Sequence, residues 1–263
     1  MKREKSMKTA VIGIWLILAM ALAMPSSVHA IGLEVAIGGW NQDPQGDIAY
    51  KPIGSSDSLN LERDLKYDTE SKTMGRIKID MPLFVPNIYI MGTQSEFDGT
   101  GDKRVNFRFG NRTFRANIDF YSKIRLTHYD IALYYGLPFI QIASANMLNV
   151  EAGLNVRIVD FDAKVRQPDT GISESKSLII PIPMVYLGVQ FSPVKKLAIE
   201  LEGRGISYSG NSLYSFMGRV KFKPKGPFFI SGGYRYDKIE IDESRIDADA
   251  EFTGPFAEIG LQF

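Results

Sequence analysis

The stretch PFAEIGLQF, residues 255–263, closes the chain and decides its fold. Counting back by twos from Phe263 gives Leu261, Ile259 and Ala257, which are all apolar, whereas the residues between them are polar or small. This alternation predicts a β-strand with one apolar face that ends on an aromatic residue. The last strand of a transmembrane β-barrel has such a face, because it contacts lipid and closes against the first strand. We therefore predict an all-β protein, a transmembrane antiparallel β-barrel.

The first thirty residues have the pattern of an export signal. An apolar run over residues 10–24 is too short for a stable membrane helix, and small residues follow it up to Ala30. The run is preceded by four basic residues, Lys2, Arg3, Lys5 and Lys8. We expect a signal peptide over residues 1–30, cleaved after Ala30, and a single barrel domain over residues 31–263. An uncleaved anchor is the alternative, and translation could start at Met1 or Met7.

Composition excludes several classes of protein. Residues 1–30 hold four of the 31 basic and one of the 30 acidic residues, which leaves a net charge near −2 and predicts no nucleic-acid partner. The remainder has no apolar run of 18 residues, so no transmembrane helix is predicted. Because the chain has no cysteine, neither a lipid-anchored lipoprotein nor a disulfide can form. With one histidine beyond residue 30, no metal site and no cofactor are expected.

Alternation between apolar and polar residues recurs along the chain at regular intervals. In residues 148–162, for example, Leu154 lies on an apolar face and Asn155 on the polar one. The apolar faces carry no charge over about five positions and have aromatic residues near their ends, which is typical of lipid-facing strands. The pattern predicts ten strands, with eight or twelve as alternatives: residues 31–40, 74–81, 88–97, 124–136, 148–162, 175–191, 196–206, 213–223, 228–237 and 251–263.

The connections alternate between two kinds, which predicts periplasmic turns at one end and extracellular loops at the other. The short ones are residues 82–87, 192–195 and 224–227, with residues 137–147 somewhat longer. The others are mostly long and polar: residues 41–73, 98–123, 163–174, 207–212 and 238–250. Both termini then lie on the periplasmic side. Within residues 98–123, the stretches 107–109 and 114–120 could form an extra hairpin.

Several short motifs resemble a known family. They are Gly38-Gly39-Trp40, the stretch LNLERDL at residues 59–65, Tyr129-Asp130, Leu133-Tyr134-Tyr135 and the terminal Phe263. The chain is similar to a family of small Gram-negative outer-membrane barrel proteins with an early Gly-Gly and an uncharacterised role. The resemblance covers most of residues 31–263. It implies the fold and a place in the outer membrane, but no chemistry.

The carboxy-terminal strand also carries a candidate assembly signal, Leu261 and Phe263. It would be read by the barrel-assembly machinery, and the surrounding outer-membrane lipid, including lipopolysaccharide, would be the other partner. Assembly signals usually have glycine five residues before the terminal aromatic residue, whereas Glu258 stands there and Gly260 follows, so the match is partial. The sequence leaves the oligomeric state open.

Alternation places eight acidic and eight basic side chains inside the barrel. The acidic ones are Glu34, Asp80, Asp130, Glu151, Glu200, Glu202, Asp237 and Glu258, and the basic ones are Arg76, Lys78, Arg157, Arg204, Arg219, Lys221, Lys223 and Arg235. Around eight strands, side chains just fill a barrel, and ten leave little more room. Since unpaired buried charge is costly, the balance predicts a charge-paired, largely closed lumen. A narrow channel or transporter for small solutes is the alternative.

Other candidate sites are weaker. His128 shares a face with Asp130, but no nucleophile is identifiable beside the pair, so we expect no enzyme; a lipid-acting enzyme is a third alternative. Seven acidic residues in 237–251 follow no calcium-loop spacing and predict a solvated loop. A basic and aromatic loop could bind lipid phosphate, or be a solvated loop, through Lys103, Arg104, Arg108, Arg112 and Arg115. We predict an outer-membrane barrel with a structural or interaction role.

Overall fold

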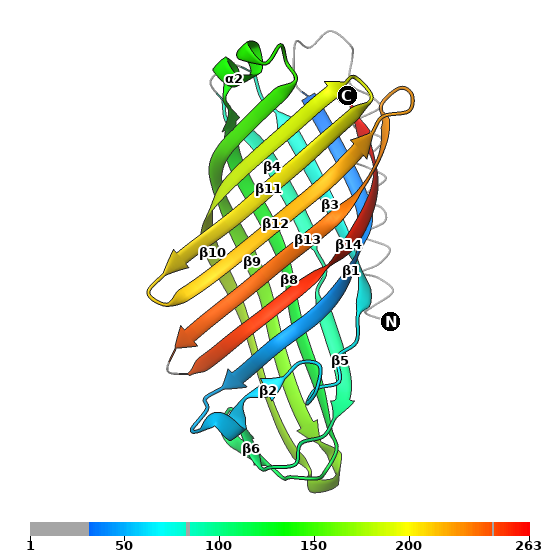
Figure 1. Cartoon of the computed structure of the whole chain (residues 1–263). Helices are drawn as coiled ribbons and strands as arrows, with labels where there is room; N and C mark the ends of the chain where they lie inside the picture. Colours follow the sequence, from blue (N-terminus) through cyan, green and yellow to red (C-terminus); the bar gives the residue numbers. More distant parts are fainter. Residues whose placement is uncertain (1–31, 83–84, 244) are drawn as a thin grey trace, which may run out of the picture. The chain divides into compact units, whose positions relative to one another are not determined.

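The computed structural model describes residues 32–82, 85–243 and 245–263, so the predicted signal peptide lies outside the described residues. The described chain forms one antiparallel barrel (Figure 1). Its wall consists of β1 (Gly32–Tyr50), β3 (Glu70–Asp80), β4 (Asn87–Thr93) with β5 (Glu96–Gly101), β8 (Phe120–Gly136), β9 (Leu148–Gln167), β10 (Ile172–Val194), β11 (Leu197–Tyr208), β12 (Asn211–Phe222), β13 (Phe228–Glu243) and β14 (Ile246–Gln262). Because β4 and β5 pair with the same strand, β8, they form one wall strand, and the predicted count of ten is confirmed.

The barrel closes where β14 pairs with β1, from Glu34 opposite Gln262 to Tyr50 opposite Ile246. The first glycine of Gly38-Gly39 lies in this seam. A Cβ atom on Gly38 would lie 2.1 Å from the carbonyl oxygen of Ala257, so no larger residue fits there.

The two ends of the barrel differ in their connections. At one end lie residues 81–82 and 85–86, residues 137–147 with the short helix α2 (Pro138–Ala143), residues 195–196 and residues 223–227. At the other end, η2 (Pro168–Thr170) joins β9 to β10, and two residues with positive φ, Ser209 and Gly210, join β11 to β12. The connections 51–69 and 102–119 at this end are long.

The predicted extents of the long loops 163–174, 207–212 and 238–250 were wrong, because the strands continue through most of them. β10 has 23 residues, roughly 75 Å at the usual rise per residue. A transmembrane strand needs only about ten residues. The barrel wall therefore continues well beyond a bilayer.

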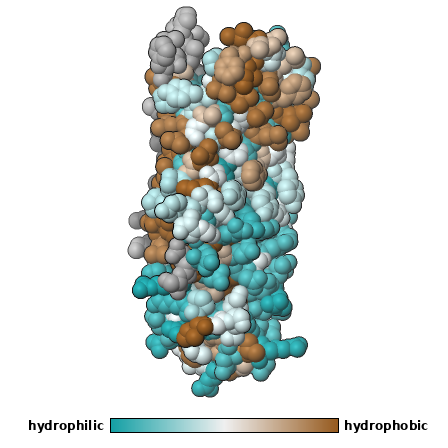
Figure 2. All heavy atoms as spheres, turned by 60° about the vertical axis from the view of Figure 1, so that its left-hand side comes forward, coloured by the Kyte–Doolittle hydropathy of each residue, from teal (hydrophilic) through white to brown (hydrophobic). Residues whose placement is uncertain are grey.

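The polarity of the wall inverts along its strands. On β9, outward-facing Leu154 is 71% exposed and inward-facing Asn155 is 1% exposed. Four positions further on, the outward side chains become charged and the inward ones apolar: Asp160, Asp162 and Lys164 face out, and Val159, Phe161 and Ala163 face in. Figure 2 shows the result, with hydrophobic side chains gathered over one end of the barrel and hydrophilic ones over the other. The part of the wall with apolar outward-facing side chains, which we call the apolar belt, suits lipid outside. The part with charged outward-facing side chains suits water outside.

Residues 51–69 and 102–119 fold together at the outer end, and we call them the lid. The lid contains η1 (Ser55–Asp57), β2 (Leu59–Asn60) and the hairpin of β6 (Phe107–Phe109) and β7 (Arg112–Phe114). A hairpin thus forms in this stretch, outside the barrel wall, but its second strand is residues 112–114 and not the predicted 114–120. The ring centroids of Phe107 and Phe114 are 5.1 Å apart. The lid side chains share one buried cluster with inward-facing Ile124, Ala163 and Val165. In the described chain, no helix is long and apolar enough to span a membrane.

The polarity inversion yields a first prediction. Leu154→Arg should destabilise the folded barrel by about 2–4 kcal/mol, because the charge would lie near the bilayer midplane. Ser177→Arg, on the outward face of β10 beyond the apolar belt, should change stability by less than about 0.5 kcal/mol. Urea unfolding of both variants in lipid vesicles measures the difference. Equal losses of stability in the two variants would show that the position assigned to the apolar belt along the strands is wrong.

Candidate functional site

The lumen within the apolar belt is filled by paired charges, which we call the charged layer. Its members are seven acidic side chains, Glu34, Asp130, Glu151, Glu200, Glu202, Asp237 and Glu258, and seven basic ones, Arg76, Lys78, Arg157, Arg204, Arg219, Lys221 and Arg235. Each forms at least one ion pair within the set. Of the sixteen predicted lumenal charges, Asp80 is exposed at the end of β3, and Lys223, just after β12, is half-buried.

The centre of the charged layer is built around two arginines. Arg76 on β3 lies 2.5 Å from Glu34 and 3.2 Å from Glu258. Arg219 on β12 lies 2.9 Å from Glu202, 3.3 Å from Glu200 and 3.9 Å from Glu258. The side chains of both arginines and of Glu258 are 0% exposed. Water therefore does not reach these three side chains.

Nearer the outer end, four charges from three strands form a second group. Arg157 donates two hydrogen bonds to Asp130, at 2.9 and 3.0 Å, and Arg235 donates two to Asp237, at 3.0 and 2.7 Å. A 3.5 Å contact between Arg157 and Asp237 joins the two pairs. Such bidentate pairs fix the orientation of both partners as well as neutralising them.

His128 belongs to this group and has both ring nitrogens engaged. Its Nδ1 lies 2.9 Å from the carbonyl oxygen of Leu126, and its Nε2 lies 3.0 Å from a guanidinium nitrogen of Arg235. Arginine can only donate, so Nε2 accepts and Nδ1 carries the proton. The nearest Asp130 oxygen is 4.0 Å from Nε2, and Asp130 itself is occupied by Arg157. The geometry suits a histidine that positions Arg235 rather than one that withdraws a substrate proton.

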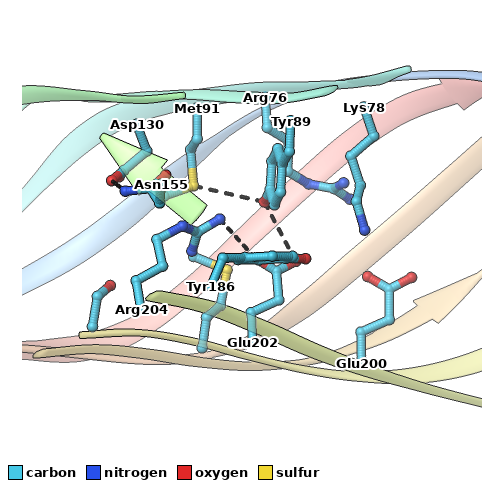
Figure 3. Close-up of polar contacts among 12 residues, drawn as sticks. Arg76, Lys78, Tyr89, Met91, Asp130, Asn155, Tyr186, Glu200, Glu202 and Arg204 are labelled. Carbon is cyan, nitrogen blue, oxygen red and sulfur yellow. Dashed lines mark hydrogen bonds and ion pairs between the residues drawn. The ribbon is translucent and has the colours of Figure 1, made fainter. Parts of the chain in front are cut away.

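Tyrosines brace the charged layer from opposite walls. Tyr89 from β4 and Tyr186 from β10 approach with ring centroids 5.9 Å apart, and the Arg204 guanidinium carbon lies 4.8 Å and 5.2 Å from the two ring centroids (Figure 3). The Tyr89 hydroxyl donates to Glu202 at 3.3 Å and the Tyr186 hydroxyl to Glu151 at 2.8 Å. Sequence reasoning missed both tyrosines, although alternation places each of them on the inward face of its strand, the same face that carries the charges of the neighbouring strands.

Sequence reasoning also missed the outer half of the lumen, which is aliphatic. Its inward-facing residues include Ile124, Leu126, Val159, Phe161, Leu178, Ile180, Ile182, Ile206, Leu213, Ile239 and Ile241. The signal was present: in residues 159–166, apolar and charged residues alternate as strictly as in the predicted strands, but with the opposite faces. The stretch of seven acidic residues is the β13–β14 hairpin, in which Lys238 contacts Glu240, Asp249 and Glu251.

The five predicted phosphate ligands lie in the lid but do not converge. Lys103 is held by the Ser58 carbonyl and, at 3.3 Å, by Asp64. The Arg108 side chain donates to the Gly110 carbonyl at 2.8 Å. Arg104, Arg112 and Arg115 are exposed. Their phosphate-binding role stays a prediction.

The predicted assembly signal lies at the other end of the barrel. Phe263 exchanges backbone hydrogen bonds with Leu33, at 2.8 and 3.3 Å, and its side chain is 50% exposed. Leu261 pairs with Val35 on one side and Phe228 on the other. Backbone pairing with β1 therefore continues one residue beyond β14, to Phe263, and the aromatic ring lies on the outside. In the described residues, no group of three or more histidine or carboxylate side chains could hold a metal ion.

Comparison with known proteins supports the fold alone. No family model matches the sequence, and no curated protein matches it. The outer-membrane protease OmpT of Escherichia coli is similar in structure, with a TM-score of 0.54 and 8% identity over 91% of this chain and 100% of OmpT. Further matches are the translocator domain of the autotransporter NalP from Neisseria meningitidis (TM-score 0.43, 9% identity, 99% and 98% of the two chains) and Ail of Yersinia pestis (0.33, 13%, 87% and 98%). The chain thus has the fold of Gram-negative outer-membrane β-barrels, and the family resemblance through Gly38-Gly39 stays a prediction.

The carboxylate of Asp57 links the two segments of the lid, which gives a second prediction. Although burial opposes it, backbone N–H groups of Ile53, Arg108 and Gly54 hold the pKa of Asp57 below its usual value. Asp57→Asn removes the charge, so we expect the lid to open about fivefold more often at neutral pH. Amide hydrogen exchange in residues 102–119 measures this opening.

The pH dependence has a defined sign. Because the folded-state pKa is lowered, the contribution of Asp57 is complete above the ordinary aspartate pKa of 3.8 and is lost as the pH falls through the lowered value. Wild type and variant should therefore converge in acid. A difference that persists unchanged below the lowered pKa would contradict the role of the charge.

Proposed function

We propose that the chain is an integral protein of the outer membrane that does not conduct solutes and has a structural or interaction role at the cell surface. The carrying observation is the charged layer, because Arg76, Arg219 and Glu258 are inaccessible to water at the centre of the lumen. Removing one partner of such a buried pair costs about 3–5 kcal/mol. The layer therefore both closes and stiffens the membrane-spanning part.

The same arrangement argues against a channel and against catalysis. A solute passing through would have to separate ion pairs that cross the lumen between non-adjacent strands, such as Arg157 on β9 with Asp237 on β13 and Lys78 on β3 with Glu151 on β9. Both nitrogens of His128 are already hydrogen-bonded. What remains available to partners is the part beyond the membrane, where the lid presents Arg104, Arg112 and Arg115. These exposed guanidinium groups are our candidates for binding lipid phosphate.

The proposed location implies export through the signal peptide at residues 1–30 and insertion by the barrel-assembly machinery. Leu261 and Phe263 are the residues we propose it reads. Their support is geometric: β14 pairs to its end, and the Phe263 ring stands exposed beside the closing seam.

Conductance tests the closed lumen. Wild-type protein in planar bilayers should give no resolved current steps. Arg76→Ser combined with Arg219→Ser should give small cation-selective steps, because the carboxylates of Glu34, Glu200 and Glu258 stay in the space that the guanidinium groups vacate. Arg76→Lys, which keeps the cation, is the control and should remain silent. Discrete steps from the wild type would overturn the proposal in favour of a channel.

Truncation tests assembly. Deleting Phe263, or Phe263→Asp, should sharply reduce the membrane-inserted fraction, read as the heat-modifiable band on gels from outer-membrane fractions. Phe263→Tyr keeps an aromatic ring and should insert normally. Recovery of wild-type protein in the soluble periplasm would contradict the location itself, whereas normal insertion of the deletion would contradict only the signal.

A further inference from the structure

An apolar cavity of about 370 Å³ lies inside the outer half of the barrel, beside the lid. Aliphatic side chains from eight wall strands line it, among them Leu178, Ile180, Ile206, Leu213 and Ile239. Small-molecule sites usually have volumes of about 300–1,000 Å³ and mostly apolar walls. A cavity of about 150 Å³ already holds benzene. This cavity is large enough for a hydrocarbon chain.

The cavity lies where the wall is open. Pairing between β10 and β11 ends at Val185 opposite Gly205, whereas β10 continues to Ile172 and pairs there with β9 alone, within the part of the chain that the structure describes. Leu178, Ile180 and Ile182 line the cavity on one side of this break, and Ile206 and Tyr208 line it on the other. The break is therefore an entrance through the side of the barrel.

The sequence of β10 suits such an entrance. Pro181 and Pro183 lie in the part of β10 that has no partner strand on the β11 side. Proline suits this position because it has no backbone N–H to leave unsatisfied. The outward-facing side chains change at the same height, since Ile179 is apolar and 75% exposed while Ser177 and Ser175 are polar. The break begins within the apolar belt, since Val185 pairs with lipid-facing Leu154, and it extends past Ile179 to the polar outward-facing residues Ser177 and Ser175. It therefore crosses the outer boundary of the belt, where an amphiphile in the membrane has its headgroup.

One basic side chain stands at the rim of the cavity. Lys176 lies two residues before Leu178 on the inward face of β10. The described part of the chain places no carboxylate within 4.0 Å of its ammonium group. Two acidic residues also lie at the rim. Glu240 and Asp247 are both on the outward-facing sides of their strands, β13 and β14, by alternation, and Glu240 contacts Lys238 at 2.9 Å and accepts a hydrogen bond from Ser212 at 2.6 Å. The charge left to meet a ligand in the cavity is positive.

We propose that this cavity binds a single-chain anionic amphiphile, a long-chain carboxylate, with its hydrocarbon tail among the aliphatic side chains and its carboxylate at Lys176. The tail gains by leaving water, at about 0.8 kcal/mol for each buried methylene group. The carboxylate gains a charge-assisted hydrogen bond from an ammonium group that lacks an ionic partner. The inference does not depend on a non-conducting lumen, because the cavity lies beyond the charged layer.

Photo-crosslinking tests the proposal on the folded barrel in lipid nanodiscs. The probes are dodecanoic acid with a terminal diazirine and the corresponding dodecanol, and labelled residues are identified by peptide mass spectrometry. We expect inward-facing residues such as Ile180 and Leu213 to be labelled. Ala248→Phe, which fills the cavity, should reduce this labelling about tenfold. Ala257→Phe, on the lipid-facing side of the same strand, should leave it unchanged.

The headgroup is tested separately. Lys176→Met should reduce labelling by the acid about tenfold and leave labelling by the alcohol unchanged. Lys164→Met removes an outward-facing lysine opposite Ser175 and should affect neither probe. Because Lys176 lies outside the charged layer, its variant keeps the test decisive even where Ala248→Phe fails to fold. Labels confined to outward-facing residues such as Ile179 in every variant, or equal effects of Lys176→Met on acid and alcohol, would overturn the proposal.

Discussion

The structure depends on one constraint, which is that a backbone amide inside a bilayer has no water to bond with. The N–H and C=O groups in the apolar belt need partners on neighbouring strands, so the sheet closes on itself except along the edge of β10 that begins at Met184. The seam between β14 and β1 meets this requirement, and it does so with close backbone contact at Gly38. Once the wall is closed, each side chain has only two directions to point, toward lipid or toward the lumen.

These two directions explain both the charged layer and the aliphatic outer half of the lumen. Where lipid lies outside, apolar residues take the outer face and charges are driven inward, where they survive only as pairs such as Arg157 with Asp130. Where water lies outside, the faces exchange roles and an ordinary hydrophobic core forms inside, from Val159 and Phe161 onward. The lid completes this core with its own aromatic side chains. A single chain thus contains a membrane barrel continued by a water-soluble one.

Much of the membrane part could be predicted from the sequence, because alternation is a local signal. Leu154 and Asn155 lie on the faces that the period of two indicates, and the strand count follows from turn spacing. The partners within the lumen could not be predicted. Arg76 and Glu258 are 182 residues apart, and only the register of the closed barrel brings them together. The strand ends were misjudged for a different reason. Charged residues such as Lys164 and Lys238 were assigned to loops, although water-facing strands carry the same residue types.

The length of the β9–β10 hairpin bears on how the protein reaches its final state. Its outer half presents charged and hydroxyl side chains on the outward face, from Asp160 to Ser175, and in the proposed orientation these must cross the bilayer to reach the cell exterior. Threading them singly would expose each in turn to lipid. A hairpin already paired over its full register buries its backbone polar groups before transit and leaves only side chains to be sheltered. The topology therefore favours delivery of this segment as a preformed ribbon, with its tip leading and the barrel closing behind it.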